Sequence, residues 1–106
     1  MAWAALLFAG ILEVVWSLAM KQSHGFSRLW PSMVTIGAMI VSFALLSYAM
    51  RSLPLGTAYT IWTGIGAVGA FAVGVAVLGE ALTPLRLIAA ALIVGGLVLM
   101  KIASPA

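Results

Sequence analysis

The sequence predicts an all-α membrane protein built from four transmembrane helices. Of its 106 residues, 65% are hydrophobic and only 7% are charged, and the mean hydropathy is +1.26. A soluble domain of this length does not have enough interior to bury that much apolar surface. The apolar residues form four runs, each close to the roughly 20 residues that a helix needs to cross a bilayer. The runs lack the alternation typical of strands in a membrane barrel, so helices are predicted.

The first two of the four apolar runs have clear boundaries, with a polar turn between them. The four runs occupy residues 3–20, 30–50, 55–78 and 85–102. The first run has no basic segment before it, and three comparable runs follow, so we expect a membrane span here and not a cleaved signal peptide. It stops at Lys21, which begins the polar segment 21–28. In the second run, Pro31 stands where a helix tolerates proline, in the first turn.

The third and fourth runs follow the same design. A break at 51–54 contains Pro54, and a second break at 79–84 contains Gly79 and Pro84. These turns are too short to hold a soluble domain. We therefore expect residues 1–106 to form a single four-helix transmembrane domain that works inside the bilayer.

The charge distribution predicts a weak preference for orientation. With four spans, one side of the membrane carries two basic residues, Arg51 and Lys101, and the other side carries three, Lys21, Arg28 and Arg86. Orientation is set by the Lys/Arg bias between the two sides, and two against three is almost no bias. Dual orientation is therefore predicted, which permits an antiparallel homodimer.

Several classes of function are disfavoured by composition. The basic residues are scattered at the ends of apolar runs, where they reach lipid headgroups, and they do not form a nucleic-acid-binding patch. The chain has no cysteine, so no disulfide, thiol chemistry or cysteine zinc site is expected. No nucleophile–base pair, metal cluster or phosphate loop is recognisable, so neither an enzyme nor a metal site is predicted.

Glu13 is the acidic residue that lies deep within a predicted span. A charge at the bilayer centre costs about 2.5–3.5 kcal/mol on insertion scales. No Lys or Arg of the sequence lies at matching depth, so Glu13 must be neutral or must bind a cation from outside the chain. This predicts a proton or cation site; the alternative is a permanently protonated carboxyl that joins two helices. Glu80 lies in a turn and is expected to be a solvated loop acid.

Aromatic and hydroxyl side chains are predicted to surround Glu13. Trp16 lies one helical turn along on the same face. On other spans, Tyr59 and Trp62 are also one turn apart, and Ser42 lies near the middle of the second run. Aromatic faces attract cations and a carboxylate accepts paired N–H bonds, so this set suits a planar organic cation.

Glycines mark two of the spans. Small residues let membrane helices approach closely, and in the third span they also permit bending. The third span matches G-x-G-x-x-G, but no soluble strand precedes it, so a dinucleotide site is rejected. The fourth span has no polar residue of note and is expected to contact a partner chain. The glycines assigned to packing or bending are Gly64, Gly66, Gly69, Gly95 and Gly96.

Along essentially its whole length the sequence resembles the small multidrug resistance family of four-helix, proton-coupled exporters. The matching segments include residues 9–16, 25–32, 53–66 and 79–83. Trp16 after Glu13, with Met39 and Ser42 in the second run, is similar to the guanidinium exporters of that family. The quaternary-ammonium branch typically has glycine in place of Trp16 and tyrosine in place of Met39.

The resemblance implies an antiparallel homodimer in the bacterial inner membrane, with both copies of Glu13 lining one central site. Glu13 would bind a proton or the substrate, guanidinium or a small guanidinyl or organic cation. Trp16 and Ser42 would hydrogen-bond and orient Glu13, and Tyr59 and Trp62 would line the pocket. The proton gradient would supply the energy, and no cofactor is implied.

Three other functions remain open at this point. A quaternary-ammonium exporter of the same family would share the fold and mechanism. A small passive ion channel would not need a titrating acid at its centre. A non-transporting assembly subunit would tolerate conservative changes at Glu13 or Trp62.

Overall fold

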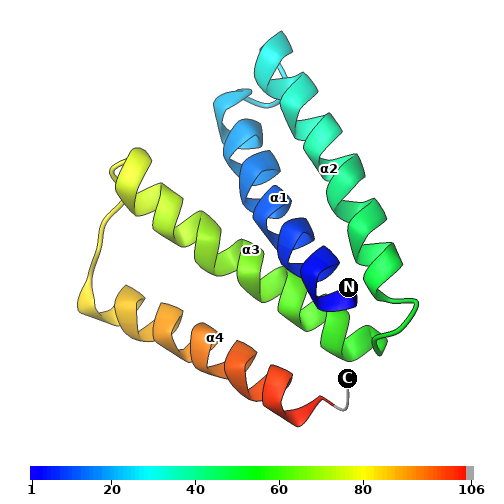
Figure 1. Ribbon diagram of the computed structural model, residues 1–106. Helices are drawn as coiled ribbons and strands as arrows, with labels where there is room; N and C mark the ends of the chain where they lie inside the picture. Colours follow the sequence, from blue (N-terminus) through cyan, green and yellow to red (C-terminus); the bar gives the residue numbers. More distant parts are fainter. Residues whose placement is uncertain (105–106) are drawn as a thin grey trace.

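The computed structural model describes residues 1–104 and shows an all-α chain of four helices, as predicted (Figure 1). Each helix is long enough and apolar enough to cross a membrane. The helices are α1 (Ala2–Gln22), α2 (Leu29–Ala49), α3 (Leu55–Val77) and α4 (Pro84–Ala103).

The helices form a thin assembly. In Figure 1, α1 and α2 run side by side in opposite directions, α3 crosses α1, and α4 lies along α3 at the far edge. The molecule measures 42 × 35 × 16 Å. Its thinnest dimension corresponds to about two layers of helices, because the axes of packed helices lie roughly 8–10 Å apart. A single chain therefore does not surround a central cavity on all sides.

The core lies where α1 and α2 meet the first half of α3. Its fully buried members include Leu6 and Ala9 of α1, Ala49 of α2 and Ala58 of α3. Small side chains at these positions let the helices approach closely, which is how helices associate in lipid. By contrast, α4 has no buried residue at all. Most of its large apolar side chains are free to face lipid or a partner chain.

The turn between α1 and α2 is closed by Ser23. This side chain is fully buried, donates to the Met20 carbonyl at 2.7 Å, and accepts from the Phe26 amide at 3.0 Å. The next three residues, 24–26, all have positive φ angles, between 49° and 72°. This left-handed stretch reverses the chain within a few residues, so α2 returns directly alongside α1.

The start of α4 carries a side-chain cap. The Thr83 hydroxyl accepts a hydrogen bond from the Arg86 amide at 3.2 Å, and Pro84 occupies the first turn. Both features are preferred at helix N-termini because the first amides have no partner within the helix. The cap sets where α4 begins after the loop that follows α3.

Candidate functional site

Glu13 lies near the middle of α1 and faces α3. Its Oε1 atom is buried and has no hydrogen-bond partner within residues 1–104. The carboxyl group rests directly on Gly66 of α3, where an added Cβ would overlap with Oε1. No ion pair joins Glu13 to a basic side chain in the described part of the protein. The structure therefore places an acid without a counter-charge at mid-span.

Two buried hydrogen bonds within the core join three helices. The Ser42 hydroxyl of α2 donates to the Ala9 carbonyl of α1 at 2.7 Å. The indole Nε1 of Trp62, on α3, donates to the Ser42 oxygen at 3.0 Å. Each polar atom in these two hydrogen bonds has a partner, so the bonds hold the three helices in one relative position.

Trp62 is also the centre of an aromatic cluster. Its ring lies 5.6 Å from the Phe43 ring in an edge-on arrangement and 5.6 Å from the Tyr59 ring in a tilted one. Trp62 is only 7% exposed, whereas Tyr59 is 52% exposed. In a single chain, Tyr59 is thus the member of the pair that is open to a ligand or a second subunit.

The predicted hydrogen bonds to Glu13 are not seen. A hydroxyl has one proton, and Ser42 gives it to the Ala9 carbonyl, so it is not donating to Glu13. Trp16 is partly buried, and its Nε1 has no partner among residues 1–104. The structure therefore leaves both a carboxylate oxygen and an indole N–H on α1 buried and unpaired. Such groups are expensive to bury without partners.

The glycines assigned from the sequence divide into two groups. On α3, Gly64 packs against Leu97, Gly66 against Glu13 and Gly69 against Val14, and a Cβ at any of the three would overlap its neighbour. A Cβ at Gly95 or Gly96 would meet nothing within 4 Å. Within one chain α4 contacts α3 through Leu97, and the packing role of Gly95 and Gly96 stays a prediction for the contact with a partner chain.

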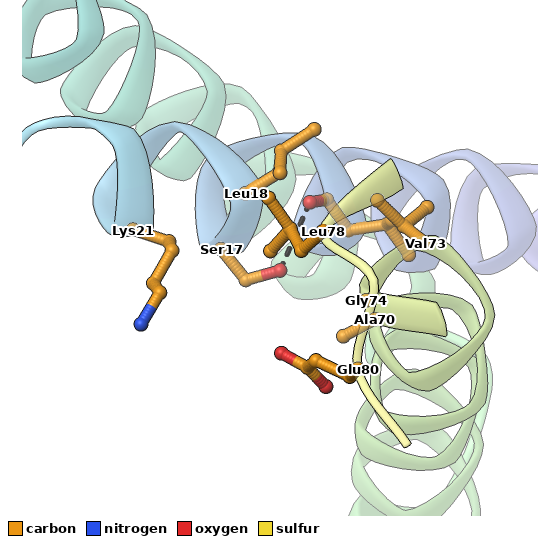
Figure 2. Close-up of a pocket in the computed structure, with 9 residues that line it drawn as sticks. Ser17, Leu18, Lys21, Ala70, Val73, Gly74, Leu78 and Glu80 are labelled. Carbon is orange, nitrogen blue, oxygen red and sulfur yellow. Dashed lines mark hydrogen bonds between the residues drawn. The ribbon is translucent and has the colours of Figure 1, made fainter. Parts of the chain in front are cut away.

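Glu80 is not simply a solvated loop acid. Its side chain is 43% exposed, but the carboxylate packs against Gly74, and Oε1 lies 3.6 Å from Nη2 of Arg86. Glu80 shares a cavity of about 160 Å³ with Ser17 and Lys21 of α1 (Figure 2). This cavity was not predicted from the sequence. The available signal was the spacing of Gly66, Ala70 and Gly74, which places three small residues on one face of α3.

A comparison with known protein families settles the relationship of the chain. The family model described as "Small Multidrug Resistance protein" matches residues 1–93. The chain belongs to the small multidrug resistance family. Among similar proteins are those named "Guanidinium exporter" from Citrobacter freundii, Salmonella typhimurium and Escherichia coli (strain K12). Each is 57% identical over 104 residues, which cover 98% of this chain and 99% of the relative.

Membership of the small multidrug resistance family agrees with the four apolar helices. The chain is a multi-pass protein of the bacterial inner membrane, and its role is in transport rather than enzymatic catalysis. Within the described residues no group of three or more His, Cys, Asp or Glu side chains is placed to hold a metal ion. Glu13 remains the candidate for binding an ion because its buried Oε1 atom has no partner among residues 1–104 and a mid-span acid is costly in a bilayer.

Proposed function

We propose that this protein is a proton-coupled guanidinium exporter whose central binding group is Glu13. The observation that carries the proposal is the buried Oε1 atom of Glu13, which has no partner in its own chain. An intramembrane acid without a counter-charge must hold a proton or an external cation. The 57% identity to proteins named "Guanidinium exporter" supports guanidinium as that cation.

The chemistry of guanidinium suits the groups around Glu13. Guanidinium is planar, and its N–H groups match the fork of carboxylate oxygens. Further along α3, the exposed ring of Tyr59 beside Trp62 offers an aromatic face that attracts a cation approaching the site. A neutral molecule of the same shape would leave the carboxylate charge uncompensated, so the site selects for a cation.

We further propose that the working unit is an antiparallel homodimer with two Glu13 side chains in one site. Three features support this arrangement. A single chain is too thin to enclose a cation, α4 has no buried residue, and the Lys/Arg bias between the two sides is almost absent. The unpaired Trp16 N–H would then find its partner across the dimer or on the ligand.

Transport follows if protons and guanidinium cannot occupy the two Glu13 carboxyl groups at the same time. Either the pair holds protons or it holds the cation, because like charges close together in a low dielectric do not both remain unpaired. If two protons leave before one guanidinium binds, each cycle exchanges two protons for one cation. An inward proton gradient then drives guanidinium out of the cell.

The test is proton movement in vesicles that contain the purified protein. With guanidinium added outside, we expect alkalinisation inside, because entering guanidinium exchanges for internal protons. Glu13→Gln keeps the size of the side chain but removes the titrating group, and it should abolish the signal.

The same assay distinguishes the other candidate functions. Proton movement with tetra-alkylammonium but not with guanidinium would indicate the multidrug branch of the family. Cation flux that persists in Glu13→Gln would indicate a passive channel. Absence of any flux in the wild-type protein would contradict transport altogether.

A further inference from the structure

Both acidic residues of this protein lie against glycines on the same face of α3. Glu13 rests on Gly66, and Glu80 rests on Gly74. The two glycines are eight residues apart, which is about 12 Å along a helix. Ala70, midway between them, also lines the cavity that contains Glu80. Ala70 and Gly74 line the cavity on the α3 side, whereas Gly66, beneath Glu13, lies one helical turn further along and is not among its lining residues.

The opposite wall of this cavity comes from α1. Val14 and Ser17 line the cavity, and they lie one and four residues beyond Glu13. The Ser17 hydroxyl donates to the Val14 carbonyl at 2.9 Å, and its oxygen faces the cavity (Figure 2). The cavity thus begins within a helical turn of Glu13 and ends at the Glu80 carboxylate, at the membrane surface.

Glu80 already binds a guanidinium group in this structure, that of Arg86. The contact is a single one at 3.6 Å, between Nη2 and Oε1, and not a two-pronged fork. The rest of the Arg86 head group is held elsewhere: Nη1 donates to the Ala81 carbonyl at 2.6 Å, and the group lies 5.0 Å from the centre of the Phe71 ring. Glu80 therefore keeps acceptor capacity for a second guanidinium.

We propose that Glu80 forms an outer site for guanidinium cations, at the membrane-surface end of the α1–α3 cavity, whose other end at Val14 lies within one helical turn of Glu13. This inference rests on the proposed function. The Glu80 carboxylate attracts the cation from solution and shares it with Arg86, and the cation then passes along the small residues of α3 to the inner carboxylate. The outer site raises the rate of capture and takes no part in proton exchange.

Lys21 keeps this outer site weak. Lys21 lines the same cavity at the end of α1, and its side chain extends on the side of α1 where Ser17 and the Glu80 carboxylate lie (Figure 2). A positive charge that lines the same cavity as the carboxylate lowers the affinity for a further cation. A transport path requires such weak binding, because a site that holds the ion tightly does not pass it on.

The experiment measures initial rates of guanidinium-driven proton movement against guanidinium concentration, in vesicles of neutral lipid at low ionic strength. Glu80→Gln keeps the shape that fits against Gly74 and removes the charge. We expect KM to rise about threefold with an unchanged maximal rate, which is the size of effect expected for a partly exposed charge pair. The difference should shrink in high salt, because exposed charges are screened.

Lys21→Gln is the matched variant, because it removes a positive charge from the same cavity, and it should lower KM for guanidinium. An unchanged KM in both variants would overturn the outer site, as would a lower maximal rate with unchanged KM in Glu80→Gln. If the wild-type protein does not respond to guanidinium, the proposed function fails, and the outer site with it. If the wild type responds, Glu13→Gln is silent and Glu80→Gln has wild-type kinetics, only the outer site is refuted.

Discussion

The contact between Glu13 and Gly66 makes a sharp prediction for Gly66→Ala. The added Cβ would overlap with the Glu13 carboxyl group, so the acid must leave the position it occupies beside α3. Overfilling a packed site costs about 1–3 kcal/mol. If that strain falls on the cation-bound state, the affinity for guanidinium falls by about fivefold to about 150-fold.

The effect on stability should be much smaller than the effect on transport. Alanine is favoured over glycine in a helix by about 1 kcal/mol, which offsets part of the strain. We therefore expect Gly66→Ala to insert and unfold nearly as the wild type does, while KM for guanidinium rises. Vesicle transport kinetics and thermal unfolding in detergent measure the two quantities separately.

Gly37→Ala is the matched control for this variant. Gly37 lies within α2, and a Cβ at this position would meet nothing within 4 Å. It should transport normally and unfold at an equal or slightly higher temperature. Wild-type kinetics in Gly66→Ala would refute the proposed position of Glu13. Equal losses in both variants would point to helix flexibility in place of the contact.

Two further predictions concern the stability of the scaffold. Ser42→Ala leaves the buried N–H of Trp62 without its acceptor, so we expect about 1–3 kcal/mol of destabilisation in detergent unfolding. Ser47→Ala, at an exposed position on the same helix, is the control and should have almost no effect. Equal values for the two variants would show that the buried hydrogen bonds do not hold the helices together. Thr83→Ala removes the side-chain acceptor for the Arg86 amide and should lower the free energy of unfolding by about 0.5–2 kcal/mol. Thr83→Ser keeps a hydroxyl and should keep most of the stability. A serine variant as unstable as the alanine variant would argue against the cap.

The fold class followed from local properties of the sequence. Run length and polarity determine whether a segment crosses a bilayer, because each helix satisfies its own backbone hydrogen bonds there. The four helices are therefore readable without knowledge of how they pack. Glu13 was identified for the same reason. Its position within an apolar run makes the charged form of its side chain unfavourable in the bilayer, however the other helices pack.

Side-chain partners were less predictable. Helical spacing placed Trp16 on the Glu13 face and paired Tyr59 with Trp62, and the latter two rings do lie 5.6 Å apart. The partner of Ser42 was expected to be Glu13, but the structure gives its proton to the Ala9 carbonyl. A serine near the middle of a helix faces one of several neighbours, and the rotation of α2 against α1 decides which.

The sequence by itself determined that this protein lies in a membrane, that it crosses it four times, and that one acid is buried without a counter-charge. These properties depend on composition and on position along single helices. Only the tertiary structure decided that Glu13 rests on Gly66, that Glu80 rests on Gly74, and that one cavity runs between α1 and α3. Those contacts depend on how the helices cross and rotate, which is set by close packing of small residues across helices far apart in the chain.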